Sequence, residues 1–208
     1  MTFKRILVTG ATGKQGGSVV RALVRANALK PASPAFHVLA MTRDAESSSA
    51  RKLALLPNVT VVVGDLDHLE PLFVKIATYG KLDAVFSVQT VSSGEERQGK
   101  ALVDAALKAG VHHFIYSSVD IGTFDVNETV GVPHFDSKRR VELHLRASGL
   151  PYTYESICSV ASNADIYMSI SPESSVQSRL WTTSSTQTSP ASSARSYAIK
   201  SDPPSRSR

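Results

Sequence analysis

The amino-acid sequence predicts an α/β fold in which a doubly wound parallel sheet carries helices on both faces. Three observations support this prediction: short apolar runs recur between residues 4 and 154, segments with helical periodicity separate them, and glycines follow the first apolar run at every third position. Apolar strands joined by helices of about ten residues or more are typical of parallel strands buried on both faces. In such Rossmann-like sheets, ligands bind at the carboxyl ends of the strands.

The expected elements follow one another in a regular order. Residues 3–17 are expected to form the first strand, a turn and the start of a helix, which Val19, Val20, Leu23 and Val24 continue as an apolar stripe. The remaining strands are expected over residues 36–41, 59–63, 84–88 and 113–117, and the remaining helices over residues 69–78, 97–109 and 135–147, the last two followed by glycines.

The glycines after the first strand predict a dinucleotide-binding turn. Gly10 allows the strand to turn sharply, Gly13 allows the backbone to approach a pyrophosphate, and Gly16 allows the following helix to pack closely on the sheet. The N-terminus of that helix supplies free N–H groups and a partial positive charge for the phosphates. The spacing G-x-x-G-x-x-G favours the short-chain and extended dehydrogenases over the long-chain ones.

A nucleoside triphosphate P-loop is the main competing interpretation of the same residues. It requires a glycine five positions before Gly13, where the chain has Val8, and a Ser or Thr after Lys14, where the chain has Gln15. The P-loop interpretation is therefore excluded.

Composition argues against several function classes. The net charge is +5, with 23 Lys and Arg against 18 Asp and Glu, but the basic residues are scattered without interleaved aromatics, so no direct nucleic-acid binding is expected. No apolar run approaches the roughly 20 residues that span a bilayer, and no secretory signal opens the chain, so we expect a cytoplasmic or nuclear protein without a membrane segment. Cys158 is the single cysteine, and His112 and His113 face opposite sides of a strand, so no metal site is expected.

The composition changes near residue 155. Serine becomes frequent and apolar periodicity fades, as is typical of chains that bury too little surface to fold. We therefore expect a dinucleotide-binding domain over residues 1–154 and a disordered, low-complexity tail over residues 155–208.

Several stretches together resemble the NmrA-like family, an atypical branch of the short-chain dehydrogenase superfamily. The resemblance covers residues 4–154. Beyond the glycine turn it is carried by Thr42-Arg43-Asp44, Gly64-Asp65-Leu66, Phe114-Ile115-Tyr116-Ser117-Ser118, His134-Phe135-Asp136-Ser137-Lys138 and Gly149-Leu150-Pro151-Tyr152-Thr153. The family continues for about another hundred residues with a sixth strand and a small substrate domain, so the resemblance implies a truncated sheet here; an altered reading frame or splice junction would explain the loss.

The second strand ends where a dinucleotide places its adenosine ribose. Arg43 offers a planar cation suited to the 2′-phosphate of NADP, whereas an acidic residue such as Asp44 would favour NAD, so we expect NADP with NAD as the alternative. The resemblance implies contacts of Asp65 and Leu66 with the adenine, although helix capping by Asp65 is an ordinary alternative. The cofactor-binding residues are expected to be Gly10, Thr12, Gly13, Lys14, Gln15, Gly16, Arg43, Asp65, Leu66 and Lys138.

Catalytic residues are suggested by the resemblance to active short-chain dehydrogenases, which carry Tyr-x-x-x-Lys on one helix face. Here His134 occupies the tyrosine position and Lys138 the lysine position. Lys138 retains the ability to bind a ribose, and a histidine exchanges protons near neutral pH, but it is shorter than tyrosine. Ser118 ends the fifth strand, where the resemblance implies a hydroxyl near the nicotinamide, and Tyr116 is expected in the core.

Two functions are compatible with these residues. The first is a regulatory dinucleotide binder whose bound redox state alters its contacts with a protein partner, and the missing tyrosine favours it. The second is an NADPH-dependent reductase of a small carbonyl or enone, in which His134 or a water molecule acts as the acid. A third possibility is a product too incomplete to function, because a sheet without its last strand exposes an apolar edge.

Overall fold

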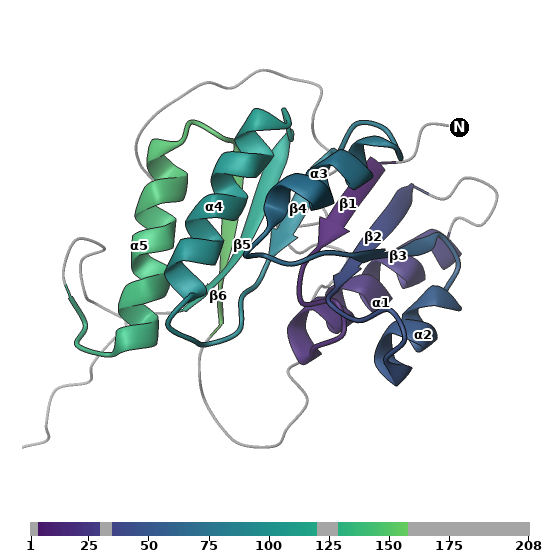
Figure 1. Cartoon of the computed structure of the whole chain (residues 1–208), viewed down its shortest axis with the longest axis horizontal. Coiled ribbons are helices and arrows are strands. Elements are labelled where there is room, and N and C mark those ends of the chain that lie inside the picture. Colours follow the sequence, from purple (N-terminus) through teal and green to yellow (C-terminus); the bar gives the residue numbers. More distant parts are fainter. Residues whose placement is uncertain (1–3, 30–34, 120–128, 158–208) are drawn as a thin grey trace, which may run out of the picture. The chain divides into compact units, whose positions relative to one another are not determined.

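The computed structural model describes residues 4–29, 35–119 and 129–157 (Figure 1). The chain divides into two units, Met1–Ile170 and Ser171–Arg208, and every described residue lies in the first. The predicted disordered tail therefore falls outside the described residues from residue 158 onward, and it remains a prediction.

The first unit is a six-stranded parallel sheet with connecting helices, which confirms the predicted Rossmann-like fold. The strand order is β3-β2-β1-β4-β5-β6, and every pair of neighbours is parallel. The elements are β1 (Lys4–Val8), α1 (Lys14–Ala28), β2 (Phe36–Thr42), α2 (Ser48–Ala54), β3 (Val59–Val63), α3 (Leu69–Ala77), β4 (Ala84–Ser87), α4 (Glu95–Lys108), β5 (His113–Val119), α5 (Pro133–Ala147) and β6 (Tyr152–Ile157).

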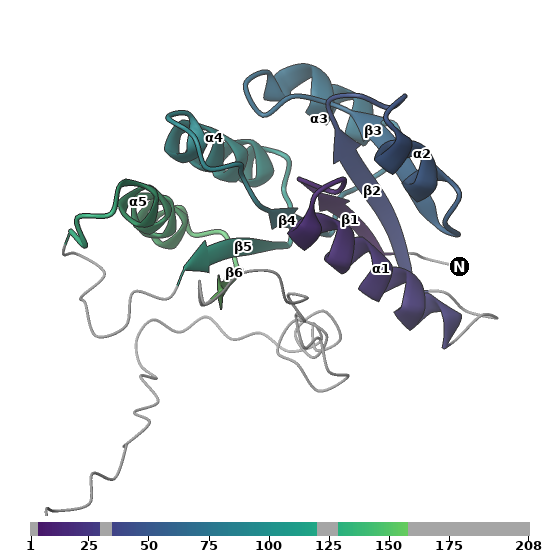
Figure 2. The same ribbon diagram turned by 90° about the horizontal axis from the view of Figure 1, so that it is seen from below.

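The helices cover the two faces of the sheet unequally. Connections from β1 to β2 and from β2 to β3 run toward one edge, and the later ones run toward the other edge. Because such crossovers are right-handed, α1 and α2 lie on one face and α3, α4 and α5 on the other (Figure 2). The direction reverses between β1 and β4, so a crevice opens at the carboxyl ends of these two strands.

The core explains why the central strands are almost continuously apolar. Most side chains on both sides of β1, β4 and β5 are excluded from water, as parallel strands in the middle of a sheet require. Fully buried examples are Leu7, Val85 and Phe114, and Leu102 of α4 and Leu145 of α5 cover them.

One helix was not predicted. Residues Ser48–Ala54 form α2, whose N-cap is Ser47, with its Oγ accepting a hydrogen bond from Ala50 N at 3.3 Å. Only Ala50 and Leu53 of this short helix are buried, so its apolar stripe is too brief to be recognised as a period in the sequence.

The expectation that the sheet lacks its last strand is wrong. Tyr152–Ile157 forms β6 and pairs in parallel with β5, from Phe114 opposite Tyr152 to Val119 opposite Ile157. Aromatic and β-branched residues alternate at its start, which suits a strand, whereas the serine-rich composition downstream obscured this signal. The strand continues past residue 154, so the predicted domain boundary cuts through it.

Asn27 joins the end of α1 to the start of β2, and its loss is expected to be costly. Its side-chain Oδ1 accepts hydrogen bonds from the backbone N–H groups of Ala35 and Phe36, both at 3.0 Å, and its Nδ2 donates to Phe36 O at 2.8 Å. Because Asn27→Ala leaves buried backbone groups without partners, we expect the free energy of unfolding to fall by about 1–3 kcal/mol. Urea denaturation of the variant tests this, and an unchanged midpoint would contradict it.

Candidate functional site

A cavity of about 370 Å³ lies at the carboxyl ends of the strands beside the reversal of strand order. Its wall combines the glycine turn after β1, the end of β2, the turn after β3 and the segment between β4 and α4. The lining residues are Gly10, Thr12, Gly13, Met41, Thr42, Arg43, Asp65, Leu66, Asp67, Val88, Thr90, Ser92 and Gln98. The cavity therefore lies where this fold class binds its ligands.

The glycine turn has the local geometry that its sequence predicts. Gly10 has φ +56°, a left-handed conformation, and turns the chain out of β1. A Cβ atom on Gly16 would lie 2.4 Å from Gly10 O and 2.6 Å from Thr9 O, so only glycine allows α1 to pack this closely. Gly13 lies exposed on the cavity wall, as its predicted role toward a phosphate requires.

The N-terminus of α1 opens toward this cavity without a protein cap. Gly13 is the N-cap, no side chain caps the helix, and its first turn holds no acidic residue. Free N–H groups and the helix dipole make such an end suitable for an anion. Lys14 is exposed beside it, and Gln15 Oε1 accepts a hydrogen bond from Ser117 Oγ at 2.7 Å. Gln15 thereby ties the glycine turn to the end of β5.

Thr9 shapes the same crevice, although the sequence analysis assigned it no role. Its buried Oγ accepts a hydrogen bond from Val88 N at 2.8 Å and lies 3.0 Å from Val88 O, to which it donates. These bonds fix the ends of β1 and β4 relative to each other. The two residues are 79 positions apart, so no local pattern indicates their pairing.

Arg43 lies where the sequence analysis expected a cofactor contact. It is exposed at the end of β2 and lines the cavity, and its side chain makes no hydrogen bond or ion pair with any residue that the structure describes. Asp44 does not line the cavity, and its Oδ1 accepts a hydrogen bond from Glu46 N at 2.8 Å. The acidic residue that would oppose NADP is thus engaged in its own turn.

Asp65 and Leu66 also line the cavity, in the turn after β3. Asp65 Oδ1 accepts a hydrogen bond from Asp67 N at 3.0 Å. The N-cap of α3 is His68, without a side-chain bond, so Asp65 does not cap that helix. Leu66 packs against the core from the same turn and leaves one side toward the cavity.

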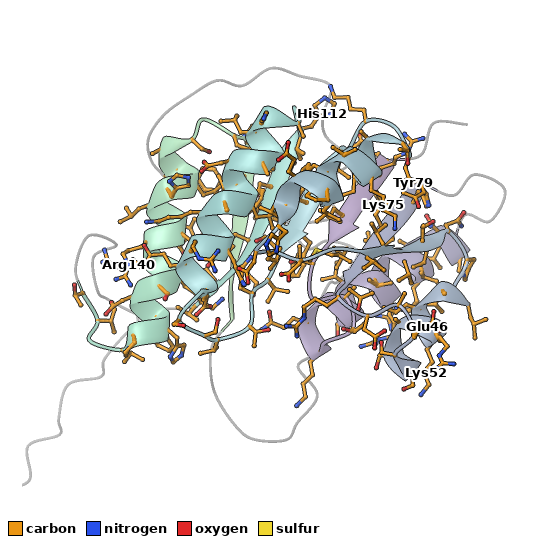
Figure 3. All side chains as sticks on the ribbon, viewed as in Figure 1. Glu46, Lys52, Lys75, Tyr79, His112 and Arg140 are labelled. Carbon is orange, nitrogen blue, oxygen red and sulfur yellow. The ribbon has the colours of Figure 1, made fainter. Side chains whose placement is uncertain are left out.

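A second depression of about 400 Å³ adjoins this site and shares Arg43 and Asp65 with it. Its far wall belongs to α3 and includes His68, Leu72 and Lys75, the last of which is labelled in Figure 3. Lys75 thus adds a second cation near Arg43, and Asp65 adds a carboxylate beside both.

Lys138, expected to bind the cofactor ribose, instead faces the protein interior. Its Nζ donates a hydrogen bond to Ser117 O at 2.8 Å and lies 3.3 Å from Glu95 Oε1. The Glu95 side chain is fully buried, and the same ammonium lies over the ring of Tyr116, 5.4 Å from its centroid. Lys138 does not line the 370 Å³ cavity, so its predicted contact with the ribose stays a prediction.

The other two expected catalytic residues are His134 and Ser118. Neither of them lines the 370 Å³ cavity. His134 lies half-buried in the first turn of α5, with its ring packed edge-on against Phe135 at 4.5 Å between centroids. Ser118 is buried and donates a hydrogen bond to Glu142. No hydrogen bond joins His134, Lys138 and Ser118 to one another among the described residues.

Tyr116 is a core residue, as predicted. It is fully buried on β5, and its hydroxyl has no hydrogen-bond partner within the part of the chain that the structure describes. Burial, followed by the negative charge of Glu95, raises the pKa of Tyr116 far above its usual value. The phenol is therefore neutral and unsuited to proton transfer.

Glu142 is expected to make stability depend on pH. Burial raises its pKa above the usual 4.5, although the hydrogen bond from Ser118 and the charge of Arg146 at 3.5 Å oppose this. The folded state then favours the protonated acid, so this contribution to stability is complete below pH 4.5 and is lost as pH rises through the raised pKa.

Replacing Glu142 with glutamine should remove that dependence. We expect the free energy of unfolding of Glu142→Gln to decline less than that of the unmodified protein as pH rises from 4.5, because glutamine does not ionise. Urea denaturation at a series of pH values measures this. Parallel curves for the two proteins would contradict it.

In residues 4–29, 35–119 and 129–157, no helix combines the length and apolarity that crossing a bilayer requires. The same residues contain no group of three or more His, Cys, Asp or Glu side chains placed to hold a metal ion.

Comparison with known proteins gives the family. The chain is 33% identical over 161 residues to the NmrA-like family domain-containing oxidoreductase lnaB of Aspergillus flavus, covering 74% of this chain and 46% of that protein. It is 33% identical over 175 residues to the nitrogen metabolite repression protein nmr of Neurospora crassa, covering 73% and 34%. The chain thus spans half or less of the length of these curated relatives.

Solved structures agree with this relationship. NmrA, a negative transcriptional regulator, in complex with NADP matches with a TM-score of 0.57 and 31% identity, over 74% of this chain and 45% of that one; a complex of NmrA with NAD matches equally well. A sequence model of the NmrA-like family matches residues 2–192, so the similarity continues past residue 154, where the recognisable motifs end. The chain belongs to the NmrA-like family.

Proposed function

We propose that this protein binds NADP(H) in the cavity between the glycine turn and the turn after β3, with NAD as a weaker ligand. The observation that carries the proposal is the close approach of α1 to the glycine turn, where a Cβ on Gly16 would lie 2.4 Å from the backbone. This approach places the uncapped N-terminus of α1 at the cavity. NmrA has been solved with both dinucleotides. When bound, the dinucleotide would supply hydride chemistry, while Gly13, Lys14 and Gln15 hold its phosphates.

The preference for NADP rests on Arg43. Its guanidinium faces the cavity without a partner among the described residues, and a 2′-phosphate would give it one. We expect Arg43→Ala to weaken NADP binding about tenfold and to leave NAD binding nearly unchanged. Isothermal titration calorimetry with both dinucleotides measures this, and an equal loss for both would remove Arg43 from the specificity site.

Lys52→Ala is a suitable control for Arg43→Ala. Lys52 is an exposed cation on α2 and does not line the cavity (Figure 3). The variant changes the net charge by the same amount as Arg43→Ala, so a general loss of electrostatic attraction would appear in both variants.

We further propose that the bound dinucleotide serves regulation, by altering contacts with a protein partner in the cytoplasm or nucleus. The supporting observation is that Lys138 and Ser118 are engaged by Glu95 and Glu142 rather than by each other or by His134. A proton-transfer set needs its groups within hydrogen-bond reach of the reacting atom. Saturable NADP binding without turnover on a panel of carbonyl compounds would support the regulatory role.

A reductase is the second candidate, because relatives of this chain are named oxidoreductases. In that case His134 or a water molecule would protonate a small carbonyl or enone substrate. NADPH oxidation that His134→Ala abolishes would establish the reductase and overturn the purely regulatory role.

A further inference from the structure

Asp67 bridges two segments that are far apart in the sequence and that both line the cavity. Its Oδ1 accepts a hydrogen bond from Arg97 Nη2 at 2.7 Å and another from Gln98 Nε2 at 2.9 Å. Asp67 belongs to the turn after β3, and Arg97 and Gln98 belong to the first turn of α4. We refer to these three side chains as the Asp67 bridge.

The position of the Asp67 bridge matters because two of its members line the cavity. Asp67 and Gln98 face the cavity together with Asp65 and Leu66 of the same turn. Asp67 N also donates to Asp65 Oδ1 at 3.0 Å, so the bridge and the turn are one hydrogen-bonded unit. The hydrogen bonds from Arg97 and Gln98 to Asp67 therefore also restrain the backbone of the turn that contains Asp65 and Leu66.

The segment before α4 is fixed by the same contacts. Thr90 and Ser92 line the cavity just before α4, and Ser92 O accepts a hydrogen bond from Glu95 N at 3.2 Å. A displacement of the first turn of α4 would therefore move this segment too. Apart from the bridge, no side-chain hydrogen bond or ion pair joins the turn after β3 to α4 within the described residues.

The charge state of the bridge is constant near neutral pH. The hydrogen bonds from Gln98 and Arg97 lower the pKa of Asp67 below its usual value of 3.8. The carboxylate of Asp67 is therefore ionised near neutral pH. Its contacts with the two donors then need no change in protonation.

We propose that Asp67 is a positioning residue, which holds the adenosine end of the cavity in its binding geometry before the dinucleotide arrives. The inference rests on the proposed function, because it concerns the same cavity. The bridge raises the fraction of molecules in which the turn after β3 has its binding conformation. Loss of the bridge lowers this fraction, and the apparent affinity for the dinucleotide falls in proportion.

The experiment compares Asp67→Ala, Arg97→Ala and the double variant by calorimetric titration with NADP and with 2′,5′-ADP, which contains only the adenosine half. We expect each single variant to bind both ligands about three- to tenfold more weakly, and the double variant to be no weaker than either single one. Asp67→Asn, which keeps a side-chain carbonyl acceptor, should recover part of the affinity.

Arg140→Gln is the matched control. Arg140 forms an ion pair with Glu96 at 2.6 Å between α5 and α4, and neither residue lines the cavity (Figure 3). Removing this half-buried pair tests the effect of losing an ion pair of α4 away from the cavity, and the NADP affinity of Arg140→Gln should stay unchanged.

Three results would overturn the role of Asp67: unchanged affinity for 2′,5′-ADP in Asp67→Ala, additive losses in the double variant, or an equal loss in Arg140→Gln. Failure of the unmodified protein to bind NADP would instead refute the proposed function.

Discussion

Gly16→Ala is expected to abolish measurable dinucleotide binding and to destabilise the fold. The added Cβ would lie 2.4 Å from Gly10 O, 2.6 Å from Gly10 C and 2.6 Å from Thr9 O. All three are backbone atoms of the glycine turn, so no side-chain rotation relieves the overlap. The first turn of α1 must move away from β1, and its N–H groups move with it.

The movement of α1 in Gly16→Ala is expected to lower both the free energy of unfolding and the affinity for the dinucleotide. Overpacking at a buried contact costs about 1–3 kcal/mol of unfolding free energy. Each charge-assisted hydrogen bond to a phosphate that the shifted N–H groups lose costs about 1.5–3 kcal/mol, which is about tenfold or more in affinity. Calorimetric titration with NADP and urea denaturation measure the two effects separately.

Gly94→Ala provides the matched control for Gly16→Ala. The three atoms nearest to a Cβ on Gly94 would be side-chain atoms of Arg97 and Gln98, the first of them Arg97 Nη2 at 3.5 Å, which is an ordinary contact. Dinucleotide affinity should therefore persist in that variant. Retained NADP affinity in Gly16→Ala would show that the phosphates do not lie over this turn.

The sequence was sufficient for the features that depend on local geometry. Gly10 needs a left-handed φ and Gly16 a close approach of α1 to the backbone, and both requirements leave glycine as the only suitable residue. The apolar runs of β1, β4 and β5 likewise follow from burial on both faces of the sheet. These features identified the fold and the glycine turn that lines the cavity.

Contacts between distant segments could not be predicted. The bonds of Thr9 with Val88 span 79 positions, and the bond of Asp67 with Arg97 spans 30. A polar residue at either position is equally compatible with a solvated surface, because one sequence contains no signal for a pairing across the sheet. The partner of Lys138 was missed for the same reason.

The sequence gives no clear signal for β6, because the composition of its surroundings is that of an unfolded chain. The serine-rich stretch after residue 157 dominated the interpretation of everything after the last helix. Tyr152, Thr153 and Tyr154 are nevertheless good strand residues. Backbone pairing with the exposed edge of β5 adds a stabilisation that no local composition measures.

Lys138→Met is expected to reduce the free energy of unfolding by about 3–5 kcal/mol, because it leaves the Glu95 carboxylate buried without its cation. The double variant Glu95→Gln/Lys138→Met removes both charges and should recover most of that loss. Lys100→Met, which breaks the more exposed pair of Lys100 with Glu96, should cost no more than about 0.5 kcal/mol. Urea denaturation measures all three.

The same variants separate the structural role of Lys138 from its predicted contact with the ribose. If Lys138 only neutralises Glu95, the double variant should regain both stability and NADP affinity. If the ammonium also binds the nicotinamide ribose, stability should return while affinity stays reduced, because methionine offers no donor. A single Lys138→Met variant as stable as the unmodified protein would contradict the structural role, since the buried carboxylate would then need no partner.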